Sequence, residues 1–141
     1  MIEGNIFNTA DFKFCHITIA DFDGGITERY QVDGLKKGDF LSADITYPLS
    51  KPAHVILTWN ENRYDLAAQI CREYRRIYKE EDESSEIEAK RICDESPESN
   101  LINRNKTNGK YGIWGHGIRD LVIEGLVINP IQKTVFLYIG S

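Results

Sequence analysis

The stretch ENRYDLAAQICREYRRIYKE, residues 61–80, predicts the element around which the chain folds. When successive residues are turned by about 100°, its apolar side chains fall on one face of a helix. They are Leu66, Ala67, Ile70, Cys71, Tyr74, Ile77 and Tyr78. Asn60 is placed to cap the N-terminus, and Glu61 lies in the first turn, where a carboxylate is favourable. We therefore expect a long amphipathic helix that packs on a sheet.

The segments before this helix carry strand signals. Residues 12–22 are apolar on both faces, which predicts a central strand, and residues 26–32 follow a DGG turn as its hairpin partner. Residues 41–47 alternate cleanly, with Ser42, Asp44 and Thr46 on the wet face. Residues 54–59 read as a fourth strand whose apolar side chains share one face, namely Val55, Leu57 and Trp59.

After the helix, Ser85 and Glu88 form a capping-box pattern that predicts a short second helix ending before Pro97. Residues 120–128 and 133–139 then predict a C-terminal β-hairpin, with Gly125 as a candidate bulge. The expected fold class is α+β: a mainly antiparallel β-sheet with one long and one short helix inserted before that hairpin. At 141 residues, the chain 1–141 is expected to be a single domain.

Composition narrows the classes of partner. The net charge of -5 repels a nucleic-acid polymer, so a phosphate-bearing partner has to be attracted by a local patch. The N-terminus lacks the basic and apolar regions of a signal peptide, and no stretch is apolar enough for a membrane span. We expect a cytoplasmic protein without membrane contact, whose three cysteines are reduced thiols.

No complete catalytic set can be read from the sequence. His16 and Thr18 form one H-x-T triplet, but two-histidine phosphoesterases need two such triplets. His16, His54 and His116 lack any metal-type spacing, and no phosphate-binding glycine motif is present. The sequence predicts no metal, no cofactor and no enzymatic activity.

Two groups of residues are candidates for ligand binding. On the predicted helix, Arg72, Arg75, Arg76 and Lys79 form a basic stripe that either holds phosphates or is a solvated face balanced by nearby acids. The second group precedes the hairpin and combines ring planes, amides and cations suited to stacking on a base and binding phosphates. Its members are Asn103, Arg104, Tyr111, Trp114, His116 and Arg119. An equally good interpretation is that Trp114 has a structural role and packs against the end of the sheet, without contacting a ligand.

The order of these elements, with NRNKTNGKYGIWGH at 103–116 leading into the hairpin, resembles the phage Thoeris anti-defence sponges that capture cyclic ADP-ribose isomers. The resemblance implies an oligomeric protein, a dimer or higher, that sequesters a signalling nucleotide in the host cytoplasm without cleaving it. It also implies an aromatic ring on the adenine and arginines on the pyrophosphate. The site residues named above follow from their chemistry in this chain.

The first hypothesis is therefore a non-catalytic, homo-oligomeric binding protein for a small nucleotide, either a cyclic ADP-ribose isomer or a cyclic oligonucleotide. The alternative is an inhibitory or immunity-type protein-interaction module, whose acidic residues 80–83 mask a basic surface on a host or toxin protein. A third hypothesis is a cyclic-nucleotide hydrolase that uses His116 with Asp120 or Glu124.

Overall fold

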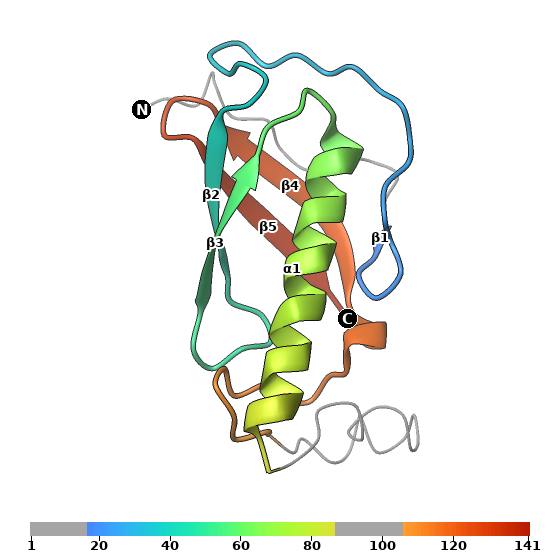
Figure 1. Ribbon diagram of the computed structural model, residues 1–141, viewed down its shortest axis with the longest axis vertical. Coiled ribbons are helices and arrows are strands. Elements are labelled where there is room, and N and C mark those ends of the chain that lie inside the picture. Colours follow the sequence, from blue (N-terminus) through green and yellow to red (C-terminus); the bar gives the residue numbers. More distant parts are fainter. Residues whose placement is uncertain (1–16, 87–105) are drawn as a thin grey trace.

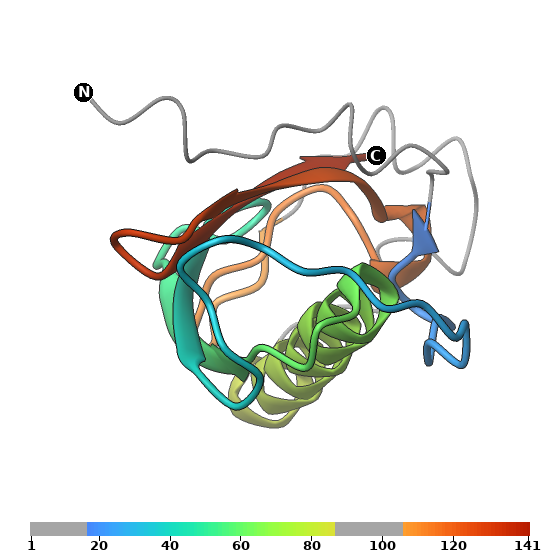
Figure 2. The same ribbon diagram turned by 90° about the horizontal axis from the view of Figure 1, so that it is seen from above.

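The computed structural model describes residues 17–86 and 106–141. Within them the fold is α+β, as predicted: one long helix, α1 (Arg63–Ser84), packs on a curled five-stranded sheet. Figure 1 shows α1 crossing the sheet, and Figure 2 shows that it lies on the concave side of the curl. No helix in this part of the chain has the length and hydrophobicity needed to cross a bilayer.

The sheet has the order β1-β4-β5-β2-β3. Its strands are β1 (Ile17–Thr18), β2 (Phe40–Ile45), β3 (Ala53–Thr58), β4 (Val122–Asn129) and β5 (Thr134–Gly140), and a 3-10 turn, η3 (Ile118–Asp120), precedes β4. Neighbours are antiparallel except β2 and β5, which pair in parallel. The C-terminal hairpin β4–β5 thus lies between β1 and β2, which brings the end of the chain beside its first long strand.

The core lies between α1 and the concave face of the sheet. Every residue of the predicted apolar helix face is buried. The predicted inward face of residues 41–47 is Leu41, Ala43, Ile45 and Tyr47, of which Tyr47 is only partly buried, and Val55, Leu57 and Trp59 of the next segment are buried. Burying a leucine or isoleucine side chain stabilises the fold by about 1.5–3 kcal/mol. The periodicities of the sequence are therefore confirmed as the pattern of the core.

The ends of α1 differ from the prediction. Asn62, and not Asn60, is the N-cap: its side chain accepts hydrogen bonds from the amides of Tyr64 and Asp65. Glu61 lies outside the helix with a positive φ of 58°. At the other end Ser85 is the C-cap of α1, so it does not begin a second helix. The predicted short helix beyond it falls mostly outside the described residues.

The N-terminal strand predictions are partly wrong. Among the described residues β1 covers Ile17–Thr18 and lies at the edge of the sheet, whereas a central strand over residues 12–22 was predicted; residues 12–16 lie outside the described part. Residues 26–32 form no strand, because their polar groups are bound to the start of α1. Asn62 Nδ2 donates to the carbonyl of Ile26, and the Arg63 guanidinium binds the Glu28 carboxylate at 2.8 Å.

The C-terminal hairpin prediction is confirmed. β4 and β5 pair from Val122↔Gly140 to Asn129↔Thr134, and the register shifts between Ile123 and Gly125. The predicted bulge is therefore present at Gly125. Such a bulge increases the local twist, which suits a sheet that curls around one helix.

Candidate functional site

The structure places the predicted loop residues in different environments. Asn103 and Arg104 lie outside the described residues. Tyr111 is only 7% exposed, and its hydroxyl donates a hydrogen bond to the Glu80 carboxylate. A ring packed in this way leaves little surface for a base. Arg119 is exposed on η3.

A buried carboxylate explains why this loop is packed. Glu81, on the last turn of α1, is fully buried and accepts hydrogen bonds from the Thr107 hydroxyl and from the amides of Gly109, Tyr111 and Gly112. Burial alone would raise the pKa of Glu81, but these hydrogen bonds outweigh it and hold the pKa below its usual value. The carboxylate therefore fastens residues 107–113 to the end of α1.

Trp114 and His116 belong to an aromatic cluster that includes Tyr47. The ring of Tyr47 lies 5.7 Å from both other rings, and the Trp114 and His116 rings are 5.9 Å apart. Trp114 remains 36% exposed, while His116 is mostly covered and its Nδ1 lies 3.6 Å from the Asp120 carboxylate. Trp114 thus packs against the start of the β2–β3 loop and also keeps a solvent-facing edge.

The arginines of the predicted basic stripe do not converge on one place. Arg75 donates to the carbonyls of Ile19 and Phe22 and contacts Asp23 at 3.1 Å. Arg76 forms ion pairs with the two glutamates one turn away on either side, and Arg72 is exposed. Two of the three arginines therefore have structural partners within the chain.

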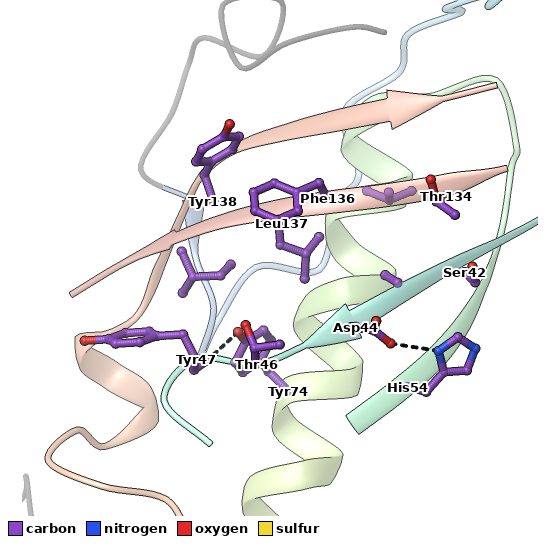
Figure 3. A pocket seen from close by; sticks show the side chains of 13 residues that line it. Ser42, Asp44, Thr46, Tyr47, His54, Tyr74, Thr134, Phe136, Leu137 and Tyr138 are labelled. Carbon is purple, nitrogen blue, oxygen red and sulfur yellow. Dashed lines mark hydrogen bonds and ion pairs between the residues drawn. The ribbon is translucent and has the colours of Figure 1, made fainter. Parts of the chain in front are cut away.

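A cleft that the sequence did not predict opens between β2 and β5. The parallel pairing of these strands is limited to Ser42↔Thr134 and Ala43↔Val135, and beyond these pairs the strands separate. The cleft has a volume of about 540 Å³. Figure 3 shows its walls, which come from β2, β3, β5 and the middle of α1. Its lining residues are Ser42, Ala43, Asp44, Thr46, Tyr47, His54, Tyr74, Thr134, Val135, Phe136, Leu137, Tyr138 and Ile139.

The apolar part of the cleft comes from β5. Phe136 and Tyr138 alternate with the core residues Val135 and Leu137, so they lie on the face away from α1, with ring centroids 5.0 Å apart in an edge-to-face arrangement. They are 61% and 45% exposed, so part of each ring is open to a ligand. At the inner end Tyr74 is fully buried, and its hydroxyl donates to the carbonyl of Tyr47 at 2.7 Å. This hydrogen bond ties the start of the β2–β3 loop to α1.

The polar part comes from β2 and β3. Asp44 and His54 are cross-strand partners, and His54 Nδ1 lies 2.8 Å from Asp44 Oδ1. Both side chains are largely exposed at the mouth of the cleft. Ser42, Thr46 and Thr134 add hydroxyl groups among the lining residues.

This arrangement combines open ring faces with hydroxyl groups and an oriented carboxylate–imidazole pair. Aromatic rings bind planar groups by stacking, and a carboxylate accepts hydrogen bonds from hydroxyl or amino groups. A histidine that contacts an aspartate at Nδ1 is also the usual arrangement of a general base. Among residues 17–86 and 106–141, no three potential ligands are grouped so that they would hold a metal ion.

The sequence contained part of the signal for this cleft. The alternation of residues 41–47 placed Ser42, Asp44 and Thr46 on the wet face, and that orientation is confirmed for Ser42 and Asp44 within β2. The pattern did not reveal which strand lies beside β2. The predicted binding residues Trp114 and His116 adjoin the observed cleft through Tyr47, which lines the cleft and contacts both of their rings.

Comparison with protein-family models, with curated proteins and with solved structures finds no match to this chain.

Proposed function

We propose that the protein binds a small nucleotide-like molecule in the cleft between β2 and β5 and retains it without converting it. The observation that carries this proposal is the lining of the cleft, where the open rings of Phe136 and Tyr138 stand opposite the carboxylate of Asp44. Stacking on the rings and hydrogen bonding to the polar wall are the two interactions that a base and its sugar require.

The size of the cleft supports a small ligand. Its volume of about 540 Å³ falls within the 300–1,000 Å³ that is typical of small-molecule sites. Its inner end is formed by side chains held in fixed positions, because Tyr74 is buried and hydrogen-bonded. A site that is already formed loses less entropy on binding than one that has to be ordered by its ligand.

The biological role within this proposal is sequestration of a signalling nucleotide, as the resemblance to phage anti-defence sponges implies. Cyclic ADP-ribose isomers contain a base and ribose that match the two walls of the cleft in chemical character. The same role includes action in the host cytoplasm and assembly of at least two chains, which light scattering of the purified protein measures.

The test is mass spectrometry of the small molecules released by heating purified protein after incubation with a mixed nucleotide pool. We expect one intact species at about one per subunit. Phe136→Ala should abolish its recovery. Phe40→Ala is the matched control, since Phe40 is 69% exposed on the same strand face but does not line the cleft.

The position of the site is tested by the same assay on Trp114→Ala. If ligand recovery is lost in Trp114→Ala and kept in Phe136→Ala, the site lies at the aromatic cluster before β4 and not in the cleft. Recovery of a cleaved product would move the protein to the hydrolases. The candidate bases would then be His54 beside Asp44 and His116 beside Asp120.

A second candidate function, a protein-interaction module, is favoured by one observation. Large apolar side chains are exposed on β2, β3 and β5, where they alternate with the buried residues that face α1: Phe40, Ile56, Phe136 and Tyr138. Exposed apolar patches often mark protein interfaces. Stoichiometric co-purification of a host protein that is lost in Phe40→Ala, together with an empty nucleotide assay, would favour this function over ligand binding.

A further inference from the structure

We infer that the cleft recognises an adenine base through the main chain of Leu137, whose amide and carbonyl form hydrogen bonds with one edge of the base. This inference rests on the proposed function and specifies how the same site identifies its ligand. It follows from the place where the pairing of β2 and β5 ends.

The first argument is the direction of the backbone groups along β5. In a β-ladder, the N–H and C=O groups of one residue point to one neighbouring strand, and those of the next residue point to the other. The Ser42 amide on β2 donates to the carbonyl of Lys133 at 3.0 Å. By this alternation the backbone groups of Leu137 also point to β2, whereas those of Phe136 and Tyr138 point to β4, with which they pair in the hairpin.

The second argument is the end of the pairing. The paired residues of β2 and β5 stop at Ala43↔Val135. In a regular parallel ladder the next bonds would join the Leu137 amide to the Asp44 carbonyl and the Leu137 carbonyl to the Thr46 amide. The strands have separated at this point, and Leu137, Asp44 and Thr46 all line the cleft. Within residues 17–86 and 106–141, no hydrogen bond uses the backbone groups that Leu137 directs at β2. Strand groups of this kind are normally paired, so a ligand in the cleft can bind them.

The third argument is the chemistry of these groups. The amide and carbonyl of one strand residue present a donor beside an acceptor on the same side of the strand. Adenine matches this pair, because N1 accepts a hydrogen bond and the 6-amino group donates one. Phe136 and Tyr138 lie directly before and after Leu137, and their rings are partly open. A base bound to the main chain of Leu137 therefore lies next to the two rings on which it can stack.

The experiment on the wild-type protein is isothermal titration calorimetry with adenosine and with purine riboside. Purine riboside keeps the sugar and N1 but lacks the 6-amino group. We expect it to bind about tenfold more weakly than adenosine, because it leaves the Leu137 carbonyl in the cleft without a donor.

Leu137→Pro removes the amide that points into the cleft and keeps the ladder with β4, which uses the neighbouring residues. Leu137→Val is the matched control, since it shortens the same side chain and keeps the amide. We expect Leu137→Pro to bind adenosine about tenfold more weakly than Leu137→Val, with circular dichroism showing that both variants are folded.

Amide hydrogen exchange gives a measurement that needs no variant. In the wild type the Leu137 amide should exchange fast without ligand and about tenfold more slowly when adenosine saturates the protein. The Phe136 amide, which points to β4, should be protected in both states and serves as the internal control. If Leu137→Pro does not fold, this measurement and the comparison of the two nucleosides decide the inference.

The outcomes separate the inference from the proposal on which it rests. If purine riboside binds as tightly as adenosine, or if adenosine leaves the exchange of the Leu137 amide unchanged, recognition through the main chain is wrong while ligand binding stands. The same holds if the protein retains another nucleotide but does not bind adenosine. If adenosine does not bind and the nucleotide pool yields no retained species, the proposed function fails and the inference fails with it.

Discussion

Replacing Glu81 with glutamine tests whether one buried carboxylate holds residues 107–113 against α1. Glu81 Oε2 accepts from the Thr107 hydroxyl at 2.6 Å and from the Gly109 amide at 2.8 Å. Oε1 accepts from the amides of Tyr111 and Gly112 at 2.7 and 3.2 Å. Three of these donors are backbone amides, which cannot accept a hydrogen bond, whereas the Thr107 hydroxyl can turn to the Ile113 carbonyl and accept from an amino group. A glutamine side chain therefore leaves at least one amide, that of Gly109, facing its amino group.

The magnitude follows from the lost hydrogen bond of the Gly109 amide. A hydrogen bond to a charged group contributes about 1.5–3 kcal/mol, so we expect Glu81→Gln to lower the free energy of unfolding by about 1.5–3 kcal/mol. Urea unfolding at pH 7 measures this change. Hydrogen exchange of the Gly109 and Tyr111 amides reports whether the loop detaches before the rest of the domain unfolds.

Glu83→Gln is the matched control, because Glu83 is on the same helix turn and exposed. We expect the control to stay within about 0.5 kcal/mol of the wild type. If Glu81→Gln is no more destabilising than Glu83→Gln, and the loop amides exchange at the wild-type rate, the carboxylate does not hold the loop and the reasoning is wrong.

Two further predictions concern stability. Hydrogen bonding from Tyr111 and then from Arg76 lowers the pKa of Glu80 to about 2, so its stabilisation is complete above the unfolded value near 4.5 and is lost as the pH falls toward 2. Glu80→Gln should therefore flatten part of the acid side of the stability profile, measured by urea unfolding between pH 7 and pH 2; an unchanged profile would contradict it. Asn62→Ala should cost about 1 kcal/mol by thermal unfolding, because the N-cap loses two amide hydrogen bonds, whereas an equal loss in Asn60→Ala would show that Asn62 has no special role at the helix start.

The parts of the fold that the sequence predicted are those determined by one-sided burial. Leu66, Ile70 and Tyr74 repeat at helical spacing because one face of α1 packs on the sheet, and the alternation of β2 has the same cause. Such patterns are local, so a single sequence contains them. The hairpin β4–β5 is also local, since its strands are joined by a short turn.

The parts that were missed depend on partners far away in the chain. Residues 26–32 have the composition of a strand, but Asn62 and Arg63 bind them to the start of α1 instead. No property of residues 26–32 alone distinguishes a strand from a segment that is bound to the first turn of a helix. The shift of the N-cap from Asn60 to Asn62 has a similar origin, because the carboxylate of Asp65 accepts the Asn60 amide and leaves Asn62 to cap the helix.

The candidate site was predictable only in its components. The wet face of β2 was identified, but the cleft exists because the C-terminal hairpin lies between β1 and β2 and places β5 beside β2. Parallel pairing of the last strand with an early one leaves no local trace in the sequence. The predicted aromatic residues before β4 adjoin the cleft through Tyr47, and Tyr111 has its own structural role against Glu80.

The exposure of Phe136 and Tyr138 is the feature for which packing of the described residues supplies no reason. Their neighbours on β5, Val135 and Leu137, already contribute to the core, so the outward rings add little to the stability of the domain. A patch of exposed rings also favours aggregation, and proteins retain such a patch where it binds something. The comparison of Phe136→Ala with Phe40→Ala decides between the two candidate functions. Of these two phenylalanines, only Phe136 is needed to bind a small ligand in the cleft, whereas a partner protein that covers the convex face needs both Phe136 and Phe40.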